Sequence, residues 1–193
     1  MMSEMKIVEE PRKPISMHPK KFAMWLFMAS VMMLFASLTS AYIVREAEGN
    51  WLYFELPSLF YYTTAIIVLS SVSLQWAYFA ARKNDIKRLK LMVLITTILG
   101  LAFLVGQFQA WGALVQNSVY FIGNPSGSFL YVLTGLHGLH IISAVIFLLV
   151  VLNSAYKNRI HSKNMAQMEM CTTYWHFLGG LWIYLFIFLV INR

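Results

Sequence analysis

Long apolar stretches alternate with short polar segments along this 193-residue chain. A helix needs about 20 mostly apolar residues to cross the hydrocarbon core of a membrane. Turn-forming residues, among them Gly49, Asn50, Pro57 and the run GNPSG at 123–127, separate the stretches. Because backbone groups in lipid must be hydrogen-bonded within the protein, the pattern predicts helices rather than open strands. The five expected spans are residues 22–44, 57–81, 90–116, 129–155 and 167–191.

Composition agrees with this pattern. The chain is 59% hydrophobic and 12% charged, whereas soluble domains are about 45–50% apolar and about 25% charged. A soluble core built from 193 residues could not hide so many long apolar stretches from water. We therefore expect an all-α, polytopic membrane protein, with one bundle of five transmembrane helices at 22–193. Residues 1–21 lack the apolar core and cleavage site of a signal peptide, which predicts a retained polar tail.

The distribution of Lys and Arg predicts the orientation of the bundle. Five of the 15 basic residues lie in the tail, five at 82–90 and three at 157–163. Successive spans alternate in direction, so these segments share one side of the membrane, and cytoplasmic loops carry the excess of Lys and Arg. The N-terminus is therefore expected to be cytoplasmic and the C-terminus outside. The net charge of +7 then belongs to segments near anionic lipid headgroups, and no pattern suggests a nucleic-acid partner.

Ionisable residues inside the spans are the candidates for function, because burying them in lipid is costly. The interiors of the first three spans contain no Asp, Glu, Lys, Arg or His. The fourth span contains His137 and His140, and the fifth contains His176 and, near its start, Glu169. His137 and His140 are three residues apart, so they lie on nearly one face of a helix.

A metal or haem site is one interpretation of the three histidines, but their depths argue against it. At a rise of 1.5 Å per residue, His140 and His176 differ in depth by about 9 Å when their spans run in opposite directions. No carboxylate lies at a depth where it could orient a ligating imidazole. The single cysteine, Cys171, excludes an intrachain disulfide and a Cys-rich metal site. We therefore expect this chain to bind no metal and no redox cofactor.

A proton relay and a packing surface are the other interpretations. A relay needs carboxylates and histidines in series, whereas Glu169 stands alone near one surface. Packing accounts for Gly135 and Gly138 beside His137, because small residues let helices approach closely, and a neutral imidazole can hydrogen-bond across helices. Thr134, Tyr174 or a backbone carbonyl would be the partners of these imidazoles. Two further expected contacts are a close approach at Gly179 and Gly180 and an ion pair between Glu169 and Arg159 or Lys163.

The segment TGLHGLHIISAVIFLL, followed by EMCTTYWHFLGGLWIYLFIFL, resembles the last two helices of subunit III of haem–copper terminal oxidases, the cytochrome c oxidase subunit III family. That family shows a His-Gly-x-His helix, then a Glu, then Tyr-Trp-His-Phe. WLFMASVMMLFASLTSAYIV, LSSVSLQWA and GLAFLVGQFQAW resemble earlier helices of the five-helix bacterial form, so the resemblance covers about residues 20–192. The matching signature residues are His137, Gly138, His140, Glu169, Tyr174, Trp175, His176 and Phe177.

The chain departs from the family at three positions that usually carry an acid. Val31 stands where the family has a membrane-buried Glu, Ala110 replaces a Glu of the third helix, and Gly179 replaces an Asp of the last. All three lost groups are acidic. A role in proton handling that the family would suggest is thereby weakened, whereas a role in packing is not.

The resemblance implies a non-redox subunit of a proton-pumping oxidase that reduces oxygen to water with cytochrome c or quinol. Haem and copper would reside in partner subunits, with subunit I as the main contact beside subunit II, and phospholipids would bind between helices. The chain would support assembly, stability, lipid binding and sustained proton uptake in the bacterial inner membrane, and the signature residues would be structural or lipid-contacting. Alternatives are a nitric-oxide reductase accessory protein, an independent transporter or proton channel, and a di-histidine haem protein.

Overall fold

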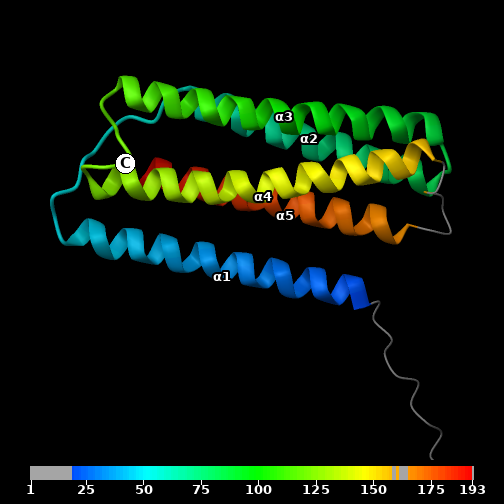
Figure 1. Ribbon diagram of the computed structural model, residues 1–193, viewed down its shortest axis with the longest axis horizontal. Helices are drawn as coiled ribbons and strands as arrows, with labels where there is room; N and C mark the ends of the chain where they lie inside the picture. The colour runs from blue at the N-terminus through cyan, green and yellow to red at the C-terminus, as the bar shows by residue number, and fades with distance from the viewer. Residues whose placement is uncertain (1–18, 158–159, 161–164, 193) are drawn as a thin grey trace, which may run out of the picture.

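The computed structural model describes residues 19–157, 160 and 165–192, and five long helices make up most of it (Figure 1). All five are long and apolar enough to cross a membrane, and no strand occurs within the described ranges. The predicted all-α bundle of five membrane helices is therefore confirmed. Of the expected tail, residues 1–18 lie outside the described part of the chain. The helices are α1 Pro19–Ala47, α2 Leu59–Arg82, α3 Ile86–Gln116, α4 Pro125–Tyr156 and α5 Ala166–Ile191.

Polar residues in the short connections determine where helices begin. The Asp85 carboxylate accepts a hydrogen bond from the backbone N–H of Arg88 at 3.2 Å, which caps the start of α3. Asn124 caps α4 in the same way, accepting from the N–H of Ser126 at 3.0 Å. The tight α2–α3 turn passes through Asn84 with φ of 56°, a left-handed conformation that Asn tolerates better than most residues.

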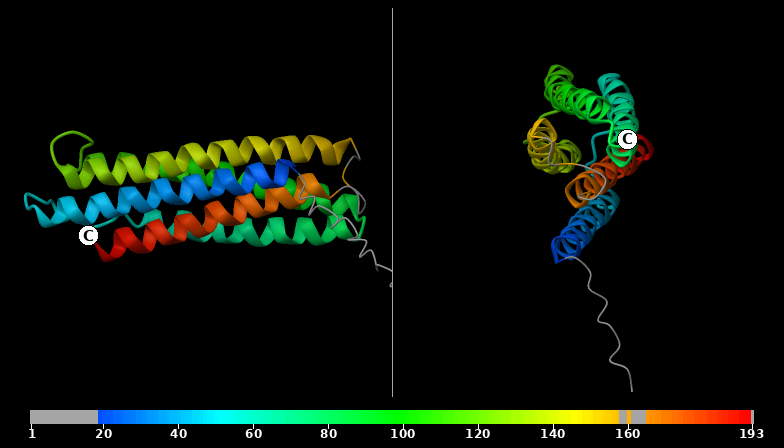
Figure 2. Two further views of the ribbon diagram at one scale, coloured as in Figure 1. Left: turned by 90° about the horizontal axis from the view of Figure 1, so that it is seen from below. Right: turned by 90° about the vertical axis from the view of Figure 1, so that its right-hand side faces the viewer.

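Four helices form a compact group, and α1 lies at its edge (Figure 1, Figure 2). The α2–α3 hairpin has the most extensive contact, α4 packs on α3, and α5 packs on both α2 and α4. Among the described helices, α1 packs only on α4 and α5. The starts of α1, α3 and α5 and the ends of α2 and α4 lie at one end of the molecule. We call this the basic end, because Lys20, Lys21 and the basic residues at 82–90 lie there; its cytoplasmic location stays a prediction.

The core is aromatic and apolar. Phe35, Phe60, Phe103, Trp175 and Trp182 are all at most 1% exposed. Phe103 meets the Trp182 ring edge-on at 5.0 Å between centroids, and Phe60 stacks on that ring at 6.1 Å. Such pairs add about 0.5–1.5 kcal/mol beyond the area they bury. Large apolar side chains cover the outward faces of the helices, as a lipid-facing surface requires.

Two glycines of α3, Gly100 and Gly106, lie tightly against side chains of other helices, whereas Gly135 and Gly138 of α4 do not. A Cβ atom at Gly100 would lie 2.6 Å from the Trp175 ring, and one at Gly106 would lie 2.5 Å from a side chain of α2. A Cβ atom at Gly138 would meet nothing within 4 Å, and one at Gly135 nothing nearer than 3.9 Å. The expected close approach at Gly135 and Gly138 is therefore wrong within this chain, because α4 turns Gly138 away from its neighbours.

Candidate functional site

His137 lies inside the bundle and is 0% exposed. Its ring is surrounded by Phe35 of α1, Phe103 of α3 and Trp182 of α5, with centroids 6.4, 6.0 and 5.0 Å away. Both phenylalanines meet it edge-on. Neither ring nitrogen has a hydrogen-bond partner among the described residues. The expected hydrogen bond to Thr134 is not made, and His137 belongs to an aromatic core that joins four helices.

The other two imidazoles have separate partners. His140 Nδ1 lies 2.7 Å from the carbonyl oxygen of Leu136 in its own helix. His176 Nε2 lies 3.1 Å from Oε1 of Gln75 on α2, so it forms a hydrogen bond across helices, as the packing interpretation predicts. The three histidines do not converge on one point. Within the described ranges, no group of three or more His, Cys, Asp or Glu side chains is placed to hold a metal ion.

Tyr174 and Trp175 connect α5 to its two neighbours in the bundle. The Tyr174 hydroxyl and Ser143 Oγ of α4 lie 2.8 Å apart. The indole N–H of Trp175 donates to Ser70 Oγ of α2 at 3.0 Å, deep in the core. These adjacent signature residues therefore bond to two different neighbours of α5 and join three helices, with both polar groups satisfied.

Glu169 forms an ion pair with Lys21 of α1, and both side chains are 36% exposed. This pair connects the basic ends of α1 and α5, which are 148 residues apart in sequence. The predicted partners Arg159 and Lys163 lie outside the described residues. Because α1 has few other contacts, Glu169 acts here as a tether for the edge helix.

Several hydrogen bonds between helices involve residues that the sequence did not single out. Their hydroxyl and indole groups sit on apolar helices, where any such group needs a partner. On α1 the buried positions recur every three or four residues, which is the spacing of a packed helix face, but the structure and not the sequence identifies them. The pairs are Thr39 with Tyr184 at 2.9 Å, Ser73 with Thr96 at 2.7 Å, and the Trp182 indole with Thr64 at 2.9 Å.

The three positions at which the resemblance implies an acid all face the interior. Val31 is 3% exposed and Ala110 is 0% exposed. A Cβ atom at Gly179 would lie 3.1 Å from Ser71 Oγ, so α5 approaches α2 closely there, whereas one at Gly180 would meet nothing within 4 Å. An acid at any of the three positions would sit against neighbouring helices, and here each position is apolar.

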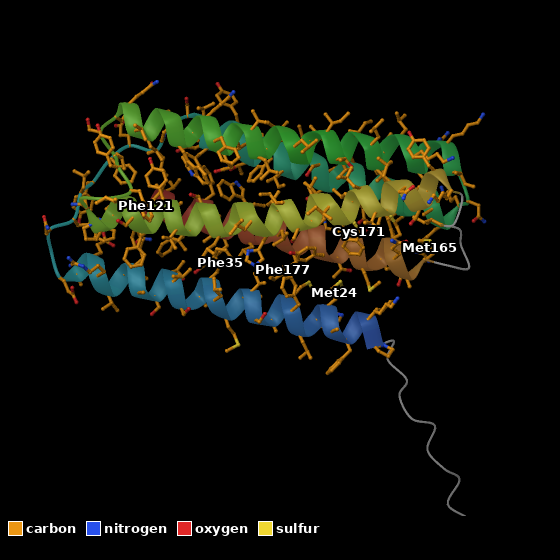
Figure 3. All side chains as sticks on the ribbon, viewed as in Figure 1. Met24, Phe35, Phe121, Met165, Cys171 and Phe177 are labelled. Carbon is orange, nitrogen blue, oxygen red and sulfur yellow. The ribbon has the colours of Figure 1, made fainter. Side chains whose placement is uncertain are left out.

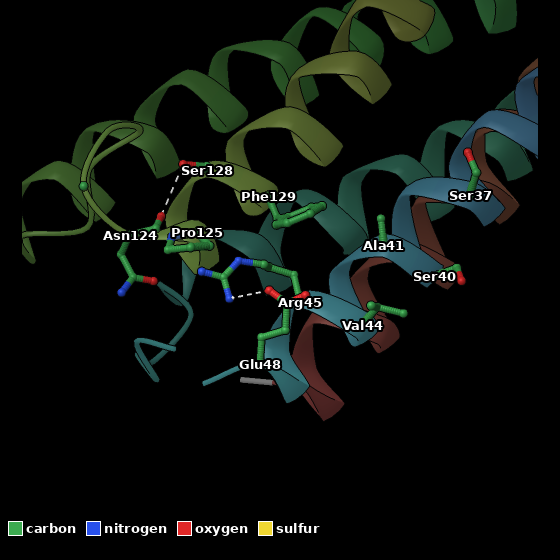
Figure 4. A pocket seen from close by; sticks show the side chains of 11 residues that line it. Ser37, Ser40, Ala41, Val44, Arg45, Glu48, Asn124, Pro125, Ser128 and Phe129 are labelled. Atoms are coloured by element: carbon green, nitrogen blue, oxygen red, sulfur yellow. Dashed lines mark hydrogen bonds and ion pairs between the residues drawn. The ribbon is translucent and has the colours of Figure 1, made fainter. Parts of the chain in front are cut away.

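Two hollows flank α1. One, of about 560 Å³, lies between α1 and α5 and includes Phe35 and Phe177 (Figure 3), with the His176 ring in its wall. The other, of about 880 Å³, lies at the opposite end from the basic segments, between α1 and the start of α4 (Figure 4). There Arg45 pairs with Glu48 at 3.0 Å. Both are open to the surroundings, and their walls combine apolar side chains with polar ones.

Known proteins resemble this chain along most of its length. A profile of the family described as "Cytochrome c oxidase subunit III" matches residues 50–192. A "Probable cytochrome c oxidase subunit 3" of Nocardia farcinica is 31% identical and aligns over 83% of this chain and 82% of its own length. "Cytochrome c oxidase subunit 3" of Bacillus sp. (strain PS3) is 26% identical over 86% of this chain and 83% of its own. The protein of that name from Spodoptera frugiperda is 33% identical over 69% and 87%.

Proposed function

This chain belongs to the cytochrome c oxidase subunit III family, and from that premise we propose that it is the non-redox subunit III of a proton-pumping haem–copper oxidase. Its place would be the inner membrane of a bacterium, where it spans the bilayer five times. The match over residues 50–192 is the observation that carries the proposal. The alignment over more than four-fifths of both this chain and the Nocardia farcinica protein supports it.

The chain's own contribution is structural in this proposal. It supports assembly, stability and lipid binding, and it sustains proton uptake by the catalytic subunit without carrying protons. Val31 and Ala110 are buried and apolar at positions where the resemblance to the family implies an acid, and this supports a structural role rather than a proton-carrying one. Haem and copper then belong to the partners, with subunit I as the main contact and subunit II beside it.

The signature residues have a packing role in this proposal. His137, Trp175 and His176 contact three different neighbouring helices through rings or hydrogen bonds. Gly138 faces outward, where a partner helix or a lipid can lie against it. His140 and Glu169 line the side of the bundle that receives α1.

Affinity purification of the tagged chain from its native membranes in a mild detergent tests the proposal. We expect a haem-bearing, copper-containing partner to co-purify in stoichiometric amount, with the visible spectrum of an oxidase. The untagged strain is the control. A chain recovered alone would overturn the proposal. Recovery with nitric-oxide reductase subunits, or ion flux from the isolated chain in liposomes, would replace it with one of the alternatives.

A further inference from the structure

The basic end of the α2–α3 hairpin carries a further hollow, apart from the two that flank α1. Its volume is about 360 Å³, and its wall combines two kinds of side chain. One part is apolar and comes from both helices, and the other part is charged and comes from the turn. The residues that matter are Trp76, Phe79, Met92, Lys83, Asp85 and Arg88.

The charged part of the wall has one cation in excess. Asp85 accepts the backbone N–H of Arg88 at 3.2 Å and pairs with the Arg88 guanidinium at 3.1 Å, so these two charges offset each other. Lys83 lines the same hollow and forms no ion pair with any described residue. Residues 82–90 contain five Lys or Arg and only one acid, Asp85. A ligand with a single negative charge therefore fits the hollow better than a neutral one.

The apolar part of the wall lies below the charge, toward the middle of the membrane. Trp76 is 60% exposed and Phe79 is 47% exposed, so both aromatic side chains are open to a ligand in the hollow. Lys83 follows Trp76 by seven residues, which is about 10 Å along a helix axis. Trp is enriched where headgroups meet acyl chains. The Lys83 ammonium group therefore lies at the depth of the lipid headgroups, and the Trp76 indole lies at the depth where the acyl chains begin.

We propose that this hollow binds one singly charged anionic phospholipid, with Lys83 contacting its phosphate and with Trp76 and Phe79 packing against the glycerol ends of its acyl chains. A soluble anion would use the charge but leave the exposed indole and phenyl rings uncovered. An uncharged lipid would use the rings but leave the Lys83 charge unmatched. The site gives the lipid binding of the proposed function one defined place and in that respect rests on it. Because the site lies within one helical hairpin, its test does not depend on any partner subunit.

Native mass spectrometry of the full purified chain in an uncharged detergent tests this site. Phosphatidylglycerol and phosphatidylcholine with identical acyl chains are titrated in parallel. We expect Lys83→Gln to weaken phosphatidylglycerol binding by about fivefold, the value for one basic residue at an anionic headgroup. Lys87→Gln is the matched control, because Lys87 is exposed in the same segment but does not line the hollow. We expect it to weaken binding less than twofold, and Lys83→Arg to retain wild-type binding.

Three outcomes would overturn the proposal. Equal losses for Lys83→Gln and Lys87→Gln would mean diffuse attraction to a basic surface instead of a site. Equal binding of the two lipids would remove the role of charge. Displacement of phosphatidylglycerol by excess inorganic phosphate would identify a plain anion site. Circular dichroism of each variant checks that the helices are intact, so that a folding defect is not read as lost binding.

Discussion

Replacing Gly100 by Ala is expected to destabilise the bundle, whereas the same change at Gly138 is not. Both glycines lie in the middle of membrane helices, so the intrinsic gain of helix propensity, about 1 kcal/mol for Gly to Ala, is common to both. The new Cβ at Gly100 would lie 2.6 Å from the Trp175 ring and 3.3 Å from a methyl group of Val145. The new Cβ at Gly138 would have nothing within 4 Å.

The size of the effect follows from how firmly Trp175 is held. Its ring is 1% exposed, and its N–H donates to Ser70 at 3.0 Å, so the ring cannot withdraw without losing that bond. Overpacking a buried site by one methyl group costs about 1–3 kcal/mol. Because the propensity gain cancels in the comparison, Gly100→Ala should be less stable than Gly138→Ala by about that amount.

Thermal unfolding of the two variants, purified in the same detergent and followed by circular dichroism, measures this difference. For a chain of this size, about 1–3 kcal/mol corresponds to a Tm lower by about 2–12 °C for Gly100→Ala. Equal Tm values would refute the contact between Gly100 of α3 and the Trp175 ring of α5. A lower Tm for Gly138→Ala would mean that α4 packs through its signature glycine after all.

Three further outcomes are expected. Lys21→Glu and Glu169→Lys should each lower the free energy of unfolding by at most about 1 kcal/mol, because the ion pair is partly exposed. The double variant should have a higher Tm than either single variant, and no such recovery would argue against the tether. His137→Phe should change the free energy of unfolding by less than about 1.5 kcal/mol in a denaturant titration, and a larger loss would reveal an unseen polar partner of the imidazole. In intact cells, an impermeant maleimide should label Tyr53→Cys and not Lys87→Cys; the reverse pattern would invert the predicted topology.

The sequence predicts the helices well because a lipid environment allows few backbone structures other than a helix of sufficient length. The length of an apolar stretch, and the turn residues between stretches, are local properties that a single sequence displays. The α2–α3 turn is an example, since Asn84 and Asp85 between two spans predict both the reversal and the start of α3. The resemblance to the oxidase family rested on contiguous motifs of the same local kind, and the comparisons confirm it.

The contacts between helices were harder to predict, because they depend on which faces meet. Gly138 stands in a conspicuous motif yet has open space beside it, whereas Gly100 stands in an ordinary apolar run and touches an indole. Lys21 served only to predict topology, because nothing local shows that the first helix lies beside Glu169. The two ring nitrogens of His137 have no hydrogen-bond partner among the described residues, because aromatic rings from three other helices surround the imidazole, and a single sequence does not show which rings these are.

The position of α1 at the edge of the bundle has a consequence for synthesis. Its contacts are with α4 and α5, and its ion-pair partner is 148 residues further along the chain. At a translation rate of about 5–20 residues per second, α1 waits about 7–30 s in the bilayer before Glu169 exists. During that interval the buried Tyr42 side chain lacks its later neighbour Phe188 on the last helix. Of the five described helices, α1 is made before the others but completes its contacts only when α5 is made, and until then other membrane proteins can contact its exposed face.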